Sequence, residues 1–172
     1  MRSLPELKAD CSRCAALCCM ALPFDKGEDF ALDKPALHPC PHLDAHRCTI
    51  HAALTERGFR GCTLYDCLGA GQRVTQEVFA GADWQRDASL RAPMAEALGI
   101  LRRVHAGIEL LEASESLALP PALAPAIAEE RAALRAAYHP DADWTLQRLT
   151  DFAASALPQR LQAFLLSLRP HV

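Results

Sequence analysis

No cysteine occurs after Cys67, although the chain runs to 172 residues. A protein stapled by disulfides throughout would spread its cysteines, so this distribution argues against such a framework. Long hydrophobic runs are also lacking, and since a transmembrane helix needs about 20 apolar residues, we expect no membrane association. The first residues, M-R-S-L-P-E-L-K-A-D, have no apolar stretch typical of a secretory signal. We therefore expect a cytoplasmic protein.

Positive charge is scarce as well. The formal net charge is −3, and the longest basic cluster is the pair Arg102-Arg103. Nucleic-acid-binding proteins usually carry a basic stripe or patch, so we expect no nucleic-acid partner. Hydrophobic residues make up 51% of the chain and charged residues 23%, which is the balance of a globular protein.

What the sequence does contain is a dense group of cysteines near its start. Residues 10–20 read D-C-S-R-C-A-A-L-C-C-M. A cysteine usually serves as a disulfide partner, a small buried hydrophobe or a thiolate ligand of a metal. Adjacent cysteines are poor disulfide partners, and a reducing cytoplasm favours metal ligation. We predict eight metal ligands: Cys11, Cys14, Cys18, Cys19, Cys40, Cys48, Cys62 and Cys67.

The first four cysteines are predicted to lie on one short helix over residues 11–22, capped by Asp10. At about 100° per residue, Cys11, Cys14 and Cys18 fall within roughly a 60° arc of such a helix. The thiol next to Cys18 lies at the edge of the same face. Three thiols can therefore point toward one place, and the fourth can reach it or a neighbouring site.

The distribution of cysteines divides the chain into a cysteine-rich metal-binding module, residues 1–80, and a helical region, residues 81–172. We expect the two to pack as one compact unit. In the module, 29–32 and 47–50 are candidates for short strands. Apolar residues at helical spacing and proline breaks predict helices over 93–117, 122–137, 144–156 and 158–168. The expected fold is mainly α: a small irregular cysteine-rich module, with room for one short β ribbon, packed on an antiparallel helical bundle.

The nature of the metal is less constrained. Thiolates suit zinc, iron–sulfur clusters or cuprous copper. Only Cys11 and Cys14 form a C-x2-C pair, so the spacing is not that of a zinc ribbon or finger. Eight thiolates could form two four-thiolate sites, or one site with other cysteines serving another purpose. Closely spaced thiolates favour a cluster, whereas eight divide readily into two zinc sites. The expected cofactor is an iron–sulfur cluster or zinc, with the cluster preferred.

Histidines are weaker candidates for ligands. His42, His46 and His51 flank the cysteines and could serve in place of thiolates. Since eight thiols already satisfy two sites, we expect these histidines at the surface or beside the ligands. His105 lies on the apolar face of the long helix, where we expect it to bond a backbone carbonyl.

The segment G-A-G-Q, residues 69–72, lacks the third glycine and the flanking strand of a nucleotide-binding loop, so we predict a turn. A four-thiolate site with zinc or a cluster carries a net charge of about −2, which nearby guanidinium groups would offset. Arg57 and Arg60 are candidates for this role, or they are simply solvated.

The motifs C-S-R-C-A-A-L-C-C, C-P-H-L, R-C-T-I-H, G-C and D-C resemble those of the YkgJ-type CxxCxxCC zinc- or iron-chelating domain family. The same order of eight cysteines is similar to the cysteine-rich segment of the flagellin lysine methylases, which implies an iron–sulfur cluster. The strings D-C-S-R-C, R-G-F-R-G-C-T-L-Y-D-C and G-A-G-Q resemble a module often attached to pentapeptide repeats in bacteria. The resemblance covers residues 10–84, and the 172 residues contain no A-[DN]-L-x-x repeat.

Three hypotheses about function follow. The first is a cytosolic bacterial metal-binding protein whose thiolates hold a cluster or zinc and whose helical half packs against a protein partner. The second is a metal- or cluster-dependent enzyme or redox protein that acts on a protein or a small molecule. The third is a metal-handling protein that buffers or delivers the ion. No nucleophile–base pair or nucleotide motif accompanies the cysteines, which favours the first.

Overall fold

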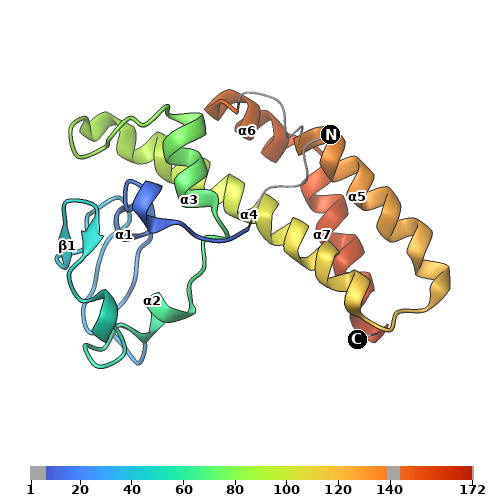
Figure 1. The fold of residues 1–172 in the computed structure, drawn as a ribbon, viewed down its shortest axis with the longest axis horizontal. Coiled ribbons are helices and arrows are strands. Elements are labelled where there is room, and N and C mark those ends of the chain that lie inside the picture. Colours follow the sequence, from blue (N-terminus) through green and yellow to red (C-terminus); the bar gives the residue numbers. More distant parts are fainter. Residues whose placement is uncertain (1–6, 139–143, 172) are drawn as a thin grey trace.

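A long helix runs through the middle of the computed structural model, which describes residues 7–138 and 144–171. Figure 1 shows the cysteine-rich part beside the first half of this helix, α4, and two further helices beside its second half. The helices of the described residues are α1 (Leu17–Ala21), α2 (Arg60–Leu64), α3 (Ala70–Arg73), α4 (Arg91–Ser116), α5 (Ala124–Tyr138), α6 (Leu146–Ala154) and α7 (Leu157–Ser167). The mainly α fold with a cysteine-rich N-terminal part is confirmed.

Helix α4 follows the apolar periodicity of the sequence closely, since the predicted range of 93–117 differs from the observed one by two residues at most. Its buried side chains recur every three or four positions and include Met94, Leu98, Leu101, Ile108 and Leu111. Because these positions share one face of a helix, α4 can bury a continuous stripe along its whole length.

The three C-terminal helices also match the predicted ranges to within two residues at each end. Helix α6 begins after Thr145, whose side chain accepts a hydrogen bond from the backbone N–H of Arg148. Arg160 on α7 forms an ion pair with Glu130 on α5, with Nη2 and Oε2 3.1 Å apart. The described helices include none that is both long and apolar enough to cross a membrane.

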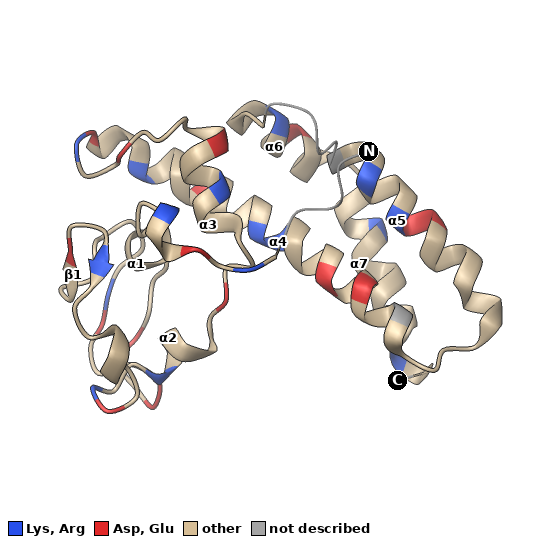
Figure 2. Ribbon diagram, viewed as in Figure 1, with Lys and Arg blue, Asp and Glu red and all other residues tan. Residues whose placement is uncertain are grey.

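One hydrophobic core joins the two predicted parts of the chain. Leu17 and Met20 of α1 are fully buried in the same cluster as Met94 and Leu98 of α4. Trp84, which lies between the module and α4 in sequence, is also part of this cluster. The cysteine-rich part therefore rests on the long helix through α1. Figure 2 shows acidic and basic residues interspersed over both parts.

The single helix predicted over residues 11–22 is wrong. A 3-10 turn spans Cys11–Arg13, Ala16 adopts a left-handed conformation with φ of 52°, and only then does α1 begin. The backbone of Ala15 is bonded to distant side chains instead of helix neighbours: its N–H donates to Oγ1 of Thr75 at 3.0 Å, and its carbonyl accepts from Nε1 of Trp84 at 2.6 Å. These tertiary bonds stabilise the bend in place of a continuous helix.

The short β ribbon is present, but one of its strands was misplaced. Strands β1 (Leu43–Asp44) and β2 (Arg47–Cys48) pair in antiparallel orientation. The second overlaps the predicted range 47–50. The range 29–32 lies instead in a loop whose ends, Phe24 and Lys34, form an isolated bridge with backbone hydrogen bonds of 3.0 and 2.7 Å.

Candidate metal centre

All eight cysteines are free thiols in the cysteine-rich part of the structure. Two of them, Cys11 and Cys62, are exposed. The partly buried ones are Cys14, Cys18, Cys19, Cys40, Cys48 and Cys67. Thiols that are partly covered by protein but still reachable are typical of ligand positions, whereas structural cysteines are usually buried completely.

The sulfurs of Cys14 and Cys67 meet at helix α3. A Cβ atom built on Gly71 would lie 2.8 Å from Sγ of Cys14 and 3.7 Å from Sγ of Cys67. Real Cβ atoms essentially never approach another atom to 2.8 Å, so a side chain at this position would force the sulfur of Cys14 or the helix to shift. The thiols of Cys14 and Cys67, which are far apart in sequence, thus both lie next to the space that a side chain at residue 71 would fill.

Helix α3 and the π-helical turn that continues it (Val74–Val78) are joined to the first cysteine segment by two amide side chains. Gln72 accepts a hydrogen bond from the N–H of Asp10 at 3.1 Å and donates one to the carbonyl of Lys8 at 2.8 Å. Gln76, one turn later, donates to the carbonyl of Arg13 at 2.9 Å. Of the segment G-A-G-Q, which the sequence predicts to be a turn, only Gly69 lies in a turn, with a φ of 77°. The other three residues are helical and belong to α3.

Cys18 and Cys19 are adjacent on α1, and their sulfurs lie 4.0 Å apart. A hydrogen bond from the Cys19 thiol lowers the pKa of Cys18 against the opposing effect of burial, and the backbone N–H groups of Cys19 and Cys18 and the nearby ammonium of Lys34 also lower it. The same hydrogen bond raises the pKa of Cys19. One thiol of the pair is thus prepared to ionise, as a metal ligand must.

The ribbon and the preceding loop carry Cys40 and Cys48 toward Cys19. The N–H of Cys40 donates to the carbonyl of Cys19 at 3.0 Å, and its own carbonyl accepts from the N–H of Leu43 at 3.0 Å. Leu43 pairs with Cys48 across the ribbon. Burial raises the pKa of Cys40, whereas a backbone N–H of His42 that points at its sulfur opposes this shift. The ribbon thereby fixes the spacing of two thiols relative to α1.

Burial also raises the pKa values of two other thiols, Cys62 and Cys14. It raises the pKa of Cys62 to about 11, and repulsion from Cys18, Cys40 and Cys48 adds to the effect. It raises the pKa of Cys14 to about 11, while a backbone N–H of Leu17 lowers it. Repulsion between distant cysteines arises only if their sulfurs are close, so these shifts reflect the convergence of the segments.

Lys34 is a residue of the candidate site that the sequence did not reveal. It is 4% exposed, and its Nζ donates to the carbonyls of Met20, Pro35 and His38 at 3.2, 3.2 and 2.7 Å. Burial lowers its pKa, whereas neighbouring thiolates favour its charge, and these are Cys40, Cys19, Cys18 and Cys62. A buried ammonium is thus held among four thiols. Nothing in the local string L-D-K-P-A indicates this burial.

The arginines proposed to offset the thiolate charge behave differently. Arg60 is half exposed and binds carboxylates, with Nη1 2.8 Å from Oδ1 of Asp29 and 3.6 Å from Oε1 of Glu28. Arg57 is exposed. The cation that lies among the thiols is a lysine, and the predicted role of these arginines is not supported by their positions.

The histidines take the subsidiary positions expected of them. His42 packs edge-on against Phe59, with ring centroids 5.0 Å apart. His46 bonds Asp83 through Nε2 at 3.1 Å. His51 is exposed. Their possible service as ligands stays a prediction.

Helix α4 holds the backbone on both sides of Cys67. Nε of Arg102 donates to the carbonyl of Asp66 at 3.1 Å, and Nδ1 of His105 lies 2.5 Å from the carbonyl of Leu68. His105 is fully buried, and burial lowers its pKa to about 4. The expectation that this histidine bonds a backbone carbonyl is therefore confirmed, and its neutral form is the one that the fold favours.

The donor set can be compared with the needs of a metal group. Among residues 7–138 and 144–171, no three or more His, Cys, Asp or Glu side chains form a group placed to hold a metal ion. The chemistry of the donors nevertheless fits a thiolate-bound group. Two sulfurs meet at Gly71, backbone N–H groups point at three sulfurs (Cys14, Cys18 and Cys40), and Lys34 supplies a counter-charge.

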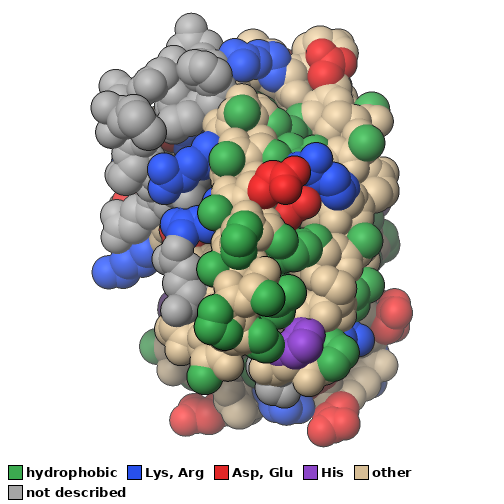
Figure 3. Space-filling model, turned by 90° about the vertical axis from the view of Figure 1, so that its right-hand side faces the viewer, with side chains coloured by type: hydrophobic (Ala, Val, Ile, Leu, Met, Phe, Trp, Pro, Cys, Tyr) green, Lys and Arg blue, Asp and Glu red, His purple; other side chains and the backbone are tan. Residues whose placement is uncertain are grey.

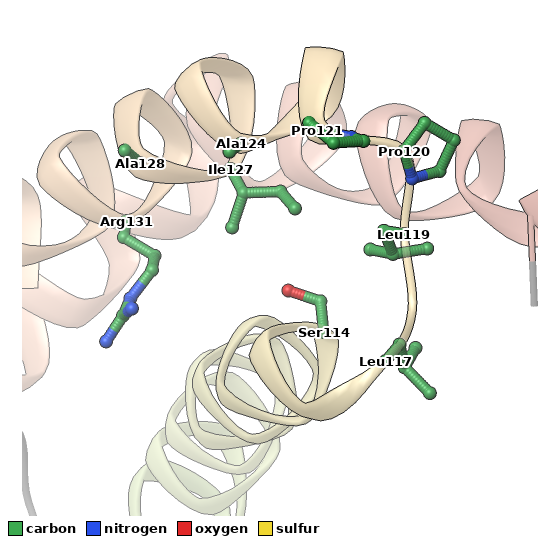
Figure 4. Close-up of a pocket in the computed structure, with 9 residues that line it drawn as sticks. All are labelled: Ser114, Leu117, Leu119, Pro120, Pro121, Ala124, Ile127, Ala128 and Arg131. Carbon is green, nitrogen blue, oxygen red and sulfur yellow. The ribbon is translucent and has the colours of Figure 1, made fainter.

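A pocket of about 350 Å³ lies in the helical region, between the end of α4 and the start of α5. Figure 4 shows Ser114, Leu119 and Ile127 pointing toward one another across it. Hydrophobic side chains also gather on the surface of this end of the molecule, as Figure 3 shows. Three leucines of the region, Leu110, Leu117 and Leu166, are at least 40% exposed. This end of the helical region thus exposes several large apolar side chains.

Comparison with known proteins gives a partial relationship. Over 101 residues, 58% of the chain, the sequence is 44% identical to "Uncharacterized protein YybG" of Bacillus subtilis (strain 168). The match spans 36% of that protein, so the chain covers little more than a third of its relative. No protein-family model matches the chain. No solved structure matches it either.

Proposed function

We propose that this chain is a metal-binding protein of the bacterial cytoplasm that holds an iron–sulfur cluster through its cysteine thiolates. The observation that carries the proposal is the meeting of Cys14 and Cys67 at Gly71, where a Cβ would lie 2.8 Å from one sulfur and 3.7 Å from the other. The two reduced thiols lie close together at a position where the chain has no side chain, and this arrangement favours a shared role for them. Soft-metal ligation is the common use of such thiols in a reducing compartment.

The electrostatic surroundings support the same function. A group of thiolates needs positive charge and hydrogen-bond donors if it is to be stable in the ionised form. Lys34 and the backbone N–H groups of Leu17, Cys19 and His42 supply both. When bound, a cluster would supply either one-electron transfer or structural support to the loops that carry its ligands.

The choice of a cluster over zinc rests on how the ligands are spaced along the chain. Cys11, Cys14 and Cys18 come from one compact segment, which suits a cluster. The resemblance to the flagellin lysine methylases favours the same cofactor, and the wider CxxCxxCC family includes zinc as the alternative. A cluster-dependent enzyme and a metal-handling protein stay the alternative functions. The partner expected to bind the helical half also stays a prediction, and its exposed leucines make that half the place to look.

The test is purification without oxygen from iron-replete cells, followed by an absorption spectrum and elemental analysis. We expect brown protein with broad absorption of visible light, which is typical of thiolate-bound iron–sulfur clusters. The protein should contain iron and acid-labile sulfide in similar amounts. Colourless protein that contains zinc would show that zinc, and not a cluster, is the bound metal. Protein that contains neither metal would contradict the proposal.

A further inference from the structure

The pocket between the end of α4 and the start of α5 combines apolar walls with one charged side chain, since Arg131 alone is charged among the described residues that line it. Its volume of about 350 Å³ lies within the usual range of small-molecule sites, which begins at about 300 Å³. We propose that the pocket binds a small aliphatic carboxylate, with the hydrocarbon chain between the two helices and the carboxylate at Arg131. The proposal does not depend on the metal, because no cysteine is among these lining residues.

Helix α5 lines the pocket with one of its faces. Its contributing residues are Ala124, Ile127, Ala128 and Arg131. They are three or four positions apart, so they lie on the same side of the helix. The first three are apolar, and the guanidinium follows about 10 Å along the helix axis from Ala124. A linear ligand that lies along this face is therefore matched by an apolar body and an anionic end.

The connection between the two helices closes the apolar end of the pocket. Figure 4 shows Leu119 and Pro120 on the side opposite to Arg131. The rings of Pro120 and Pro121 restrict the backbone of this connection, and the N–H of Leu123 donates to the carbonyl of Pro120 at 2.9 Å. This wall is thus formed before a ligand binds, which lowers the entropic cost of binding.

Ser114, the other polar residue among the described lining residues, is unsuited to bind an anion. It is 4% exposed, and its hydroxyl donates a hydrogen bond to the carbonyl of Leu111 at 2.7 Å. Because a hydroxyl has one proton to donate, its oxygen remains only as an acceptor. A carboxylate is an acceptor as well, so its charge is met by Arg131, whose planar guanidinium can donate two parallel hydrogen bonds to it. The positions of these two residues therefore set the orientation of the ligand.

The test is isothermal titration calorimetry of the full-length protein with octanoate, octanol, octylammonium and acetate. We expect octanoate to bind with a Kd below about 1 mM and acetate to show no measurable binding, because acetate lacks the hydrocarbon chain. Octanol should bind at least about tenfold more weakly than octanoate, since it lacks the charge that Arg131 meets. Octylammonium should bind more weakly still, because the guanidinium repels it.

Two variants, each with a matched control, test the two ends of the ligand separately. Arg131→Gln should weaken the binding of octanoate at least about tenfold and leave that of octanol unchanged. Its control is Arg135→Gln, which removes an exposed charge one turn further along α5. Ala128→Leu should weaken the binding of both ligands, because the larger side chain occupies the pocket. Its control is Ala132→Leu, at an exposed position one turn further on.

A folded wild type that shows no saturable binding of octanoate would overturn the proposal. Equal affinities for octanoate and octanol, or equal losses in Arg131→Gln and Arg135→Gln, would show that the guanidinium does not select a carboxylate and would overturn it too. If Arg131→Gln lowers the helical circular dichroism signal, Arg131→Lys replaces it, and the loss of the paired donors should still weaken octanoate binding. Metal content measured in the same samples tests only the proposed function, so the two can fail separately.

Discussion

Gly71 lies so close to Cys14 that a Cβ at residue 71 would be 2.8 Å from Sγ of Cys14, a contact that would force one of the two residues to shift. The same Cβ would lie 3.7 Å from Sγ of Cys67. The contact joins helix α3 to two of the candidate ligands, so its disturbance should affect stability and metal content together.

Gly71→Ala is therefore expected to lower the free energy of unfolding by about 1–3 kcal/mol, as overpacking usually does, and to reduce the metal content. Urea unfolding and elemental analysis measure the two effects. Gly99→Ala is the matched control, since nothing lies within 4 Å of a Cβ at that helical position. The control should be neutral or stabilising by about 0.5–1 kcal/mol. A Gly71→Ala protein that behaves like the control would contradict the close approach.

Lys34→Met should weaken metal binding, because it removes the ammonium that lies among the thiolates. It should also cost about 1–3 kcal/mol of unfolding free energy, since the carbonyls of Met20, Pro35 and His38 lose their common donor. Competition with a chelator and urea unfolding measure the two effects. Lys26→Met changes an exposed lysine of the same loop and should leave both unchanged. Equal behaviour of the two variants would refute the role of Lys34.

Stability should depend on pH through His105. Burial lowers its pKa to about 4 in the folded protein, from an unperturbed value of 6.5. The unfolded chain therefore binds a proton at a higher pH than the folded one. The contribution is fully present above pH 6.5 and is lost progressively as the pH falls toward 4, to a total of about 3 kcal/mol.

The variant His105→Gln keeps a side-chain donor for the carbonyl of Leu68 but does not titrate. Its unfolding free energy should fall less steeply than that of the wild type between pH 6.5 and 4. The control His171→Gln, at an exposed position, should retain the slope of the wild type. Parallel pH profiles for wild type and His105→Gln would mean that the buried histidine does not carry the effect.

Removal of the metal should unfold the cysteine-rich part and spare the helical region. Structural metal sites contribute on the order of 10 kcal/mol to folding, and the proline-rich loop over residues 35–41 has few large apolar residues of its own. Limited proteolysis after chelation should produce new cleavage in this loop and leave α4 to α7 as a resistant fragment. Restoring the metal should restore the resistance. Equal resistance with and without metal would show that the loop folds unaided.

The helical region could be predicted well from sequence because its signals are local. The apolar stripe of α4 and the prolines between helices are readable within a window of a few residues. The bend at Ala16 was missed for the opposite reason. It depends on hydrogen bonds between the backbone of Ala15 and the side chains of Thr75 and Trp84, which lie 60 and 69 residues further along the chain and leave no trace in the local string.

The candidate site was predictable only in part. The cysteine pattern predicts the candidate ligands, but it does not reveal Lys34, whose buried ammonium is bonded to three backbone carbonyls. Nor did it reveal the purpose of Gly71, since the close approach of helix α3 to two sulfurs is a tertiary feature. Residue types can be recognised from sequence, whereas counter-charges and close approaches follow from how distant segments pack.

Two side chains of helix α4, Arg102 and His105, bond the backbone carbonyls of Asp66 and Leu68, one on each side of Cys67. A sliding or tilting of this helix would pull on that peptide from both sides and shift its sulfur. A displacement of α4 caused at its far end would thus be transmitted along the helix to the thiol of Cys67. A protein that bound the helical end could change the position of this thiol without contacting the cysteines.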